Sequence, residues 1–110
     1  MEPVEINNGT WYLRGLRYDD RVDDRPELAD LGETDLDYVH DAADGWADDS
    51  MYTWAVCEPS TGELLAEITL NPKTGFMQSR ARPGHEDAAA MSEDTVRRYA
   101  SEVLNIRVHT

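Results

Sequence analysis

The strongest constraint on the fold is a pair of strand-like segments joined by a turn. Residues 51–57 are rich in Tyr, Thr, Trp and Val, residues 58–63 contain Pro, Ser, Thr and Gly, and residues 64–70 are again apolar. Aromatic and β-branched runs on both sides of such a turn are typical of a β-hairpin. Because side chains alternate along a strand, one face of the second segment is expected to carry Leu64, Ala66, Ile68 and Leu70.

Before this hairpin the sequence predicts one strand and two helices. The strand is expected over residues 5–17 and a short helix over residues 26–31. Thr34 followed by Asp37 resembles a capping box, which predicts that the second helix begins there. The inward face of this helix is expected to carry the apolar residues at helical spacing, Leu36, Val39, Ala43 and Trp46.

After the hairpin the sequence predicts a strand, a helix and a last short strand. The strand is expected over residues 76–82, and Ser92 is expected to cap the helix, which ends at Asn105. Residues 106–110 are expected to form the last strand. The inward stripe of the helix is Val96, Tyr99, Ala100, Val103 and Leu104.

The composition indicates one globular domain over residues 1–110, because this length suits a single core. A net charge of −13 argues against direct binding to nucleic acid or to an anionic membrane, both of which require clustered Lys and Arg. The start of the chain does not resemble a signal peptide, and no apolar run is long enough to span a bilayer. A single cysteine, Cys57, fits a reducing compartment, so we expect a cytoplasmic protein.

The order of elements resembles the GNAT superfamily of acetyltransferases, in particular the branch that acetylates ribosomal-protein N-termini. Residues 11–16 and 18–20 resemble the opening strand and the acidic pair of that branch, and residues 53–56 and 61–68 resemble its central hairpin. Residues 79–83 lie where its next strand ends, and residues 91–93 lie where its cofactor helix opens.

This resemblance implies an α+β fold with a mixed, mostly antiparallel sheet flanked by helices. Compared with the family, the C-terminal helix and the last two strands are missing, and that segment commonly supplies a Tyr general acid. If acetyl-CoA binds, the resemblance places it against the strand and the start of the helix, at Met77, Gln78, Ser79, Arg80, Ala81, Arg82, Ala88, Ala89 and Ala90.

The sequence departs from the family where the pyrophosphate should bind. The R/Q-x-x-G-x-G/A signature falls on residues 86–91, where Glu86 replaces the Arg and Ala89 replaces the first Gly, and Asp87 is a further acid. At an effective dielectric of 20, a carboxylate about 4 Å from a phosphate costs about 4 kcal/mol per unit charge. Two carboxylates would therefore cancel most of a micromolar affinity, which is worth about 8 kcal/mol. We therefore expect no catalytic residues, no cofactor and no metal.

Three functions follow from these observations. The first is a degenerate, shortened GNAT-like protein that binds a protein partner, or a second copy of itself, through an open sheet edge at Ile106, Arg107 and Val108. The second is an acetyl-CoA-dependent N-acetyltransferase, or one subunit of it, in which backbone amides of residues 77–82 hold the cofactor. The third is an acidic inhibitor that mimics nucleic acid through the carboxylates of residues 19–49.

Other candidate sites favour structural roles. Residues 19–24 contain four Asp but also Arg21, so a solvated loop is favoured over a cation site. The residues His40, His85 and His109 show no ligand spacing, and Cys57 is expected to be a buried apolar side chain. Glu67 is a possible general base, although an outward-facing strand carboxylate is favoured.

Overall fold

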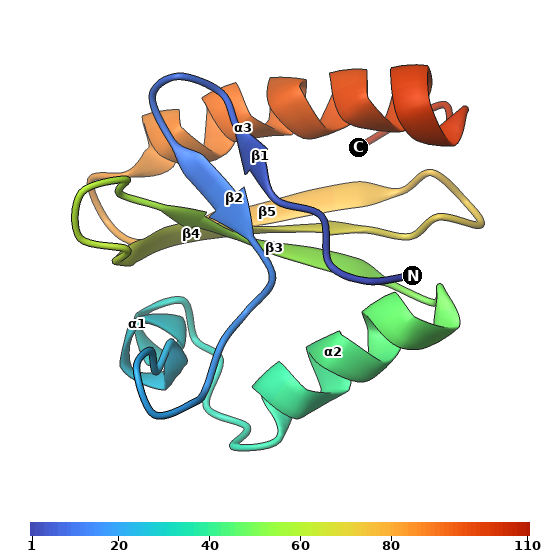
Figure 1. Ribbon diagram of the computed structural model, residues 1–110. Coiled ribbons are helices and arrows are strands. Elements are labelled where there is room, and N and C mark those ends of the chain that lie inside the picture. The colour runs from blue at the N-terminus through green and yellow to red at the C-terminus, as the bar shows by residue number, and fades with distance from the viewer.

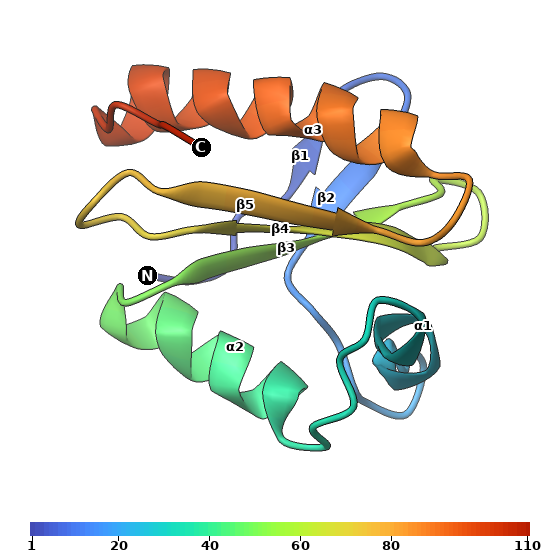
Figure 2. The ribbon, with the colours of Figure 1, turned by 180° about the vertical axis from the view of Figure 1, so that it is seen from behind.

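The computed structural model describes all residues 1–110 as one antiparallel sheet between two layers of helix. The strands lie side by side in chain order: β1 (Ile6–Asn7), β2 (Tyr12–Arg14), β3 (Tyr52–Cys57), β4 (Leu64–Leu70) and β5 (Met77–Ala81). Helices α1 (Arg25–Asp30) and α2 (Tyr38–Asp48) lie on one face and α3 (Glu86–Tyr99) on the other (Figure 1). The opposite view shows the same layers (Figure 2). The predicted α+β class is confirmed.

The central hairpin forms as predicted but contains an irregularity. Cys57 pairs with Leu64, whereas its neighbour Val56 pairs with Ala66, so Leu65 is an extra residue on β4. Such a β-bulge reverses the direction of the side chains that precede it. Leu64 therefore packs on the α1 and α2 side with Cys57, away from Ala66, and the prediction that both share one face is wrong at this position.

Two hydrophobic clusters hold the layers together. The larger one joins the sheet to α3 and also reaches Trp46 of α2, which stacks on Tyr52 with ring centroids 4.5 Å apart. The smaller one joins the sheet to α1 and α2, through Leu28, Val39, Ala55, Cys57 and Leu64. Both faces of β3 and β4 are consequently buried, which explains why these two strands are apolar almost throughout.

The N-terminal elements follow the predictions with two differences. The strand expected over residues 5–17 is a hairpin of β1 and β2, turned by the Asn8 side chain, which accepts the Trp11 N–H. Helix α2 begins at Tyr38, and Asp37 makes no side-chain cap, so the capping-box prediction is wrong. Of the four residues predicted to face inward, Val39 and Trp46 are buried, whereas Leu36 lies before the helix and is 73% exposed, and Ala43 within the helix is exposed as well.

Helix α3 begins seven residues earlier than predicted, since its N-cap is His85 and not Ser92. Its first turn carries Glu86 and Asp87, which are favourable at the positive end of the helix dipole, and three alanines of high helix propensity follow. Ser92 is fully buried in the middle of the helix, so the prediction that it caps the helix is wrong. None of the three helices combines the length and the apolar character needed to cross a bilayer.

The last turn of this helix changes its period. Residues Ala100–Leu104 form a π-helical turn, η1, which ends at Asn105 with a φ of 57°. A π turn holds more than 3.6 residues and moves the apolar stripe out of phase. Val103 is consequently 65% exposed instead of packing on the sheet, whereas the predicted inward position of Ala100 is confirmed.

Residues 106–110 do not form the expected strand. Their backbone pairs with the sheet only at an isolated parallel bridge between Phe76 and His109, where the Met77 N–H donates to the His109 carbonyl, although Ile106 and Val108 pack against the core. Gly75 permits this close approach, because a Cβ there would lie 2.1 Å from the carbonyl oxygen of Arg107. Beyond Met77, the free edge of the sheet is β5 itself.

Candidate functional site

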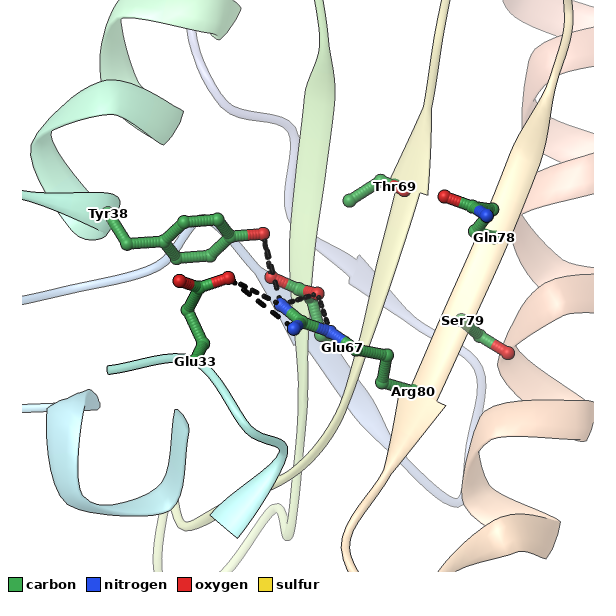
Figure 3. A pocket seen from close by; sticks show the side chains of 7 residues that line it. All are labelled: Glu33, Tyr38, Glu67, Thr69, Gln78, Ser79 and Arg80. Atoms are coloured by element: carbon green, nitrogen blue, oxygen red, sulfur yellow. Dashed lines mark hydrogen bonds and ion pairs between the residues drawn. The ribbon is translucent and has the colours of Figure 1, made fainter. Parts of the chain in front are cut away.

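A polar recess of about 310 Å³ opens on the α2 side of β4 and β5. It exists because α2 packs on β3 and α1 on β4, and neither helix covers β5. Figure 3 shows side chains from both strands and from the segment around α2 converging there. The lining residues are Glu33, Tyr38, Glu67, Thr69, Gln78, Ser79 and Arg80.

The centre of the recess is an ion pair between neighbouring strands. Glu67 on β4 lies directly opposite Arg80 on β5. The guanidinium donates to Oε1 of Glu67 from Nη2 at 2.7 Å and from Nε at 2.9 Å. Glu67 is only 2% exposed, and a buried carboxylate requires such a partner. The interpretation of Glu67 as an outward-facing strand carboxylate is therefore wrong.

Two further residues complete the cluster, and sequence analysis identified neither. The Tyr38 hydroxyl donates to Oε2 of Glu67, and Oε1 of Glu33 lies 3.4 Å from Nη2 of Arg80. Burial, followed by the bond to Glu67, raises the pKa of Tyr38 well above its usual value, so the phenol stays protonated. The only signal in the sequence was a single carboxylate, Glu67, within an apolar strand.

The strand residues predicted to hold acetyl-CoA divide between the two faces of β5. Met77 is buried in the core, whereas Gln78 and Arg80 line the recess. The Ser79 hydroxyl donates to Glu93 of α3 at 2.9 Å. Just beyond the half-buried Ala81, Arg82 forms ion pairs with Asp30 and Glu63.

The backbone of β5 has an open side. Because the Met77 N–H points away from β4, to the His109 carbonyl, alternation directs the N–H groups of Ser79 and Ala81 the same way. Beyond the His109 bridge no strand covers that side. These two amides are therefore available to a ligand or to another strand.

Two carboxylates of the chain itself, Glu86 and Asp87, lie in the first turn of α3. Only four residues, 82–85, connect β5 to the helix. The Gly84 N–H lies 3.4 Å from Oε1 of Glu86, and the Ala88 N–H donates to Asp87 at 2.9 Å. Ala88 and Ala89 are buried in the core, and of the three predicted alanines only Ala90 is exposed. The first turn of α3 therefore carries two negative charges beside its amides.

The acidic loop over residues 19–24 is tied down by arginines. Asp19 pairs with Arg17, and that hydrogen bond, with two backbone N–H donors, lowers the pKa of Asp19 to about 2. Asp23 pairs with Arg25, and Asp24 forms a buried pair with Arg14. No three His, Cys, Asp or Glu side chains converge as metal ligands. The paired aspartates leave fewer free carboxylates for nucleic-acid mimicry.

The remaining candidates occupy structural positions. His40 lies 3.5 Å from Asp44 on the surface of α2, His85 precedes α3, and His109 contacts the Thr74 carbonyl. Cys57 is fully buried, and this burial raises its pKa to about 12, which confirms the expected apolar role.

Comparison with solved structures identifies this architecture. A protein described as a ribosomal-protein-serine acetyltransferase from Vibrio cholerae matches 96% of this chain with a TM-score of 0.75 and 14% identity. An acetyltransferase from Agrobacterium tumefaciens str. C58 matches 94% with a TM-score of 0.68 and 22% identity. The chain shares the fold of these two acetyltransferases, which is the fold that the resemblance to the GNAT superfamily predicted.

This GNAT-fold chain is shorter than both solved proteins. The matches cover 72% of the Vibrio chain and 70% of the Agrobacterium chain, in agreement with the shortened fold predicted from sequence. No protein family and no curated protein matches the sequence itself.

Proposed function

We propose that this GNAT-fold chain binds a protein partner along the free edge of β5 and does not transfer acetyl groups. One observation carries the proposal: the carboxylates of Glu86 and Asp87 occupy the start of α3, where a pyrophosphate would need free amides. The proposal moves the expected interaction edge from residues 106–108, which do not form a strand, to β5.

Two further features support binding without catalysis. Both oxygens of Glu67 are engaged, by Arg80 and by Tyr38, so this carboxylate is not free to accept a proton from an amine. The Ser79 and Ala81 amides lie on an uncovered edge, and such an edge is a template for pairing with another strand.

Titration calorimetry with acetyl-CoA tests the proposal. We expect no binding at concentrations up to about 1 mM, because two carboxylates oppose the pyrophosphate. The variant carrying both Glu86→Gln and Asp87→Asn removes the charge and keeps the shape, so a gain of binding there assigns the exclusion to electrostatics. Micromolar binding to the unmodified protein would overturn the proposal.

One observation favours a second function, acetyl-CoA-dependent N-acetylation. The free amides of Ser79 and Ala81 lie beside the recess, where they suit the amide groups of a pantetheine arm as well as a peptide. Release of coenzyme A from acetyl-CoA in the presence of a panel of amines would support this function, and no release with any amine would exclude it.

A further inference from the structure

We infer that the β5 edge binds an extended segment of a basic protein and that the recess takes a lysine or arginine side chain from that segment. This inference rests on the proposed function and names the chemistry of the partner. It draws on the direction of the backbone groups, the charges around the edge and the position of the recess.

The edge fixes how a strand would pair. The Met77 N–H is already bonded to His109, so pairing begins at Ser79 and continues to Ala81. Each of these residues offers one N–H and one carbonyl on the open side, which is the arrangement used when a peptide extends a sheet. A short extended segment satisfies all four groups.

The charges around the edge favour a cation. Arg80 is paired with Glu67, and Arg82 is paired with Asp30 and Glu63, so neither guanidinium is free. Two carboxylates beside the edge are less well matched. Glu33 meets only Arg80, at 3.4 Å through one oxygen, and Glu93 accepts the Ser79 hydroxyl without a cationic partner.

These two carboxylates lie on opposite faces of β5. Glu33 is on the recess side, whereas Glu93 belongs to α3 on the other side. The side chains that line the recess sum to one negative charge, since Glu33 and Glu67 outnumber Arg80 by two to one. A strand placed between these carboxylates is stabilised by positive charge on it.

The depth of the recess selects a long side chain. A strand paired with β5 lies two strand spacings from β4, or about 9.6 Å at about 4.8 Å each. A residue of that strand opposite Gln78 or Arg80 points toward the recess, because paired residues share a face. To approach Glu33 across β5, its side chain must be long, which a lysine or arginine provides together with an apolar stem.

A second copy of this chain is a poor occupant of the same edge. Each copy carries a net charge of −13, and each β5 edge is flanked by the same two carboxylates, Glu33 and Glu93. Like charges in such an arrangement oppose association. The charge therefore favours a basic partner over a homodimer.

The inference is tested with blocked nine-residue peptides of alternating threonine and valine that carry lysine, norleucine or glutamate at the centre. In calorimetry at low salt we expect the lysine peptide to bind about tenfold more tightly than the norleucine peptide, and the glutamate peptide to bind least. Glu33→Gln is expected to weaken binding of the lysine peptide about fivefold and leave the norleucine peptide unchanged.

Pairing through the backbone is tested separately. Ser79→Pro removes an outward N–H that the sheet does not use and is expected to abolish binding, whereas Ser79→Ala keeps the N–H, frees Glu93 from its hydrogen bond and is expected to bind the lysine peptide at least as tightly as the parent does. A lysine peptide methylated at the nitrogens that face β5 leaves the protein unchanged and is also expected not to bind.

Three results would overturn the inference. These are equal affinity for the lysine and norleucine peptides, no binding of the lysine peptide at about 1 mM, and a dimer in sedimentation that Ser79→Pro dissociates. Equal affinities that remain sensitive to Ser79→Pro remove the basic preference and leave the proposed function standing. Failure of the proposed function is recognised independently, by micromolar binding of acetyl-CoA.

Discussion

Two arginine–carboxylate pairs lie on one rung of the sheet and differ in how completely they are enclosed. The rung runs from Arg14 on β2 through Ala55 and Glu67 to Arg80 on β5. At its β2 end Arg14 pairs with Asp24, and the two side chains are 6% and 3% exposed. At its β5 end Arg80 pairs with Glu67, and Arg80 is 36% exposed.

The enclosed pair is saturated with partners. Asp24 accepts two hydrogen bonds from Arg14 and one from the Arg17 N–H, while Arg14 also donates to the Gly62 and Gly15 carbonyls. This pair therefore ties the start of α1 to β2 and to the hairpin turn. Four of the five N–H groups of Arg14 are engaged and both side chains are buried, so the pair offers little room for a ligand.

The open pair, Arg80 with Glu67, can accommodate further polar contacts. Glu67 is fully engaged, but Arg80 borders a recess, and its second carboxylate contact, Glu33, is long at 3.4 Å. The same chemistry thus stabilises the fold at one end of the rung and leaves an adaptable polar surface at the other. The difference arises because Asp24 is the N-cap of α1 and lies over β2, whereas neither α1 nor α2 packs on the face of β5 that carries Arg80.

The largest loss of unfolding free energy is expected when the enclosed pair of Arg14 and Asp24 is broken. Asp24→Ala leaves the Arg14 guanidinium buried without a counter-charge, which costs about 3–5 kcal/mol of unfolding free energy. Urea denaturation followed by circular dichroism measures this loss. As a control, the double variant Arg14→Met with Asp24→Leu removes both charges and is expected to lose much less. A loss below about 1 kcal/mol for Asp24→Ala would show that the two pairs do not differ in this way.

A smaller loss of unfolding free energy is expected when the open pair of Glu67 and Arg80 is broken. Glu67→Gln removes the charge opposite Arg80, but the partly exposed guanidinium regains water, so we expect a loss of about 2 kcal/mol. Glu33→Gln, at the rim of the recess, is the matched control and is expected to change the unfolding free energy by less than about 0.5 kcal/mol. A greater loss from Glu67→Gln than from Asp24→Ala would reverse the comparison.

The smallest change in unfolding free energy is expected from the ionisation of Cys57, which lies near the enclosed pair. Burial, with smaller opposing effects of Arg14 and Asp24, raises the pKa of Cys57 from 9.0 to about 12. The unfolded thiol therefore ionises above pH 9 while the folded thiol keeps its proton, so stability falls as the pH rises. Between pH 8 and pH 10 this group contributes a loss of about 1.4 kcal/mol.

The variant Cys57→Ala isolates that contribution. Its unfolding free energy is expected to fall by about 1.4 kcal/mol less than that of the parent protein over the same pH range. Identical pH dependence of the two proteins would show that the enclosed end of the rung admits water.

Local patterns were sufficient to predict most of the elements. The hairpin, α1 and β5 each have alternation, turn residues or a proline that mark them within a few residues. The start of α3 was missed because Ser92 is a good capping residue, while the three alanines before it have strong helix propensity and extend the helix. The exposure of Val103 follows from a π turn that no spacing rule indicates.

The candidate site was predictable only in part. Gln78, Ser79 and Arg80 were expected to lie on a ligand-facing strand; the side chains of Gln78 and Arg80 line the recess, whereas the Ser79 hydroxyl bonds to α3 on the other face. The contributions of Glu33 and Tyr38 depend on how the segment before α2 folds over the sheet, which is a tertiary property. The free edge was assigned to residues 106–108 because the resemblance implied that the strands after them are missing, but only the neighbouring His109 pairs with the sheet.

The extra residue Leu65 affects how the sequence of this chain aligns with those of homologues. Because of this bulge, the side chain of Leu64 points to the opposite face of the sheet from that of Ala66. The two residues therefore belong to different hydrophobic clusters. If a homologous strand without the insertion is aligned to β4 with no gap, interior positions on one face are matched to positions on the other. A sequence alignment matches this strand correctly only when a one-residue gap is placed at Leu65.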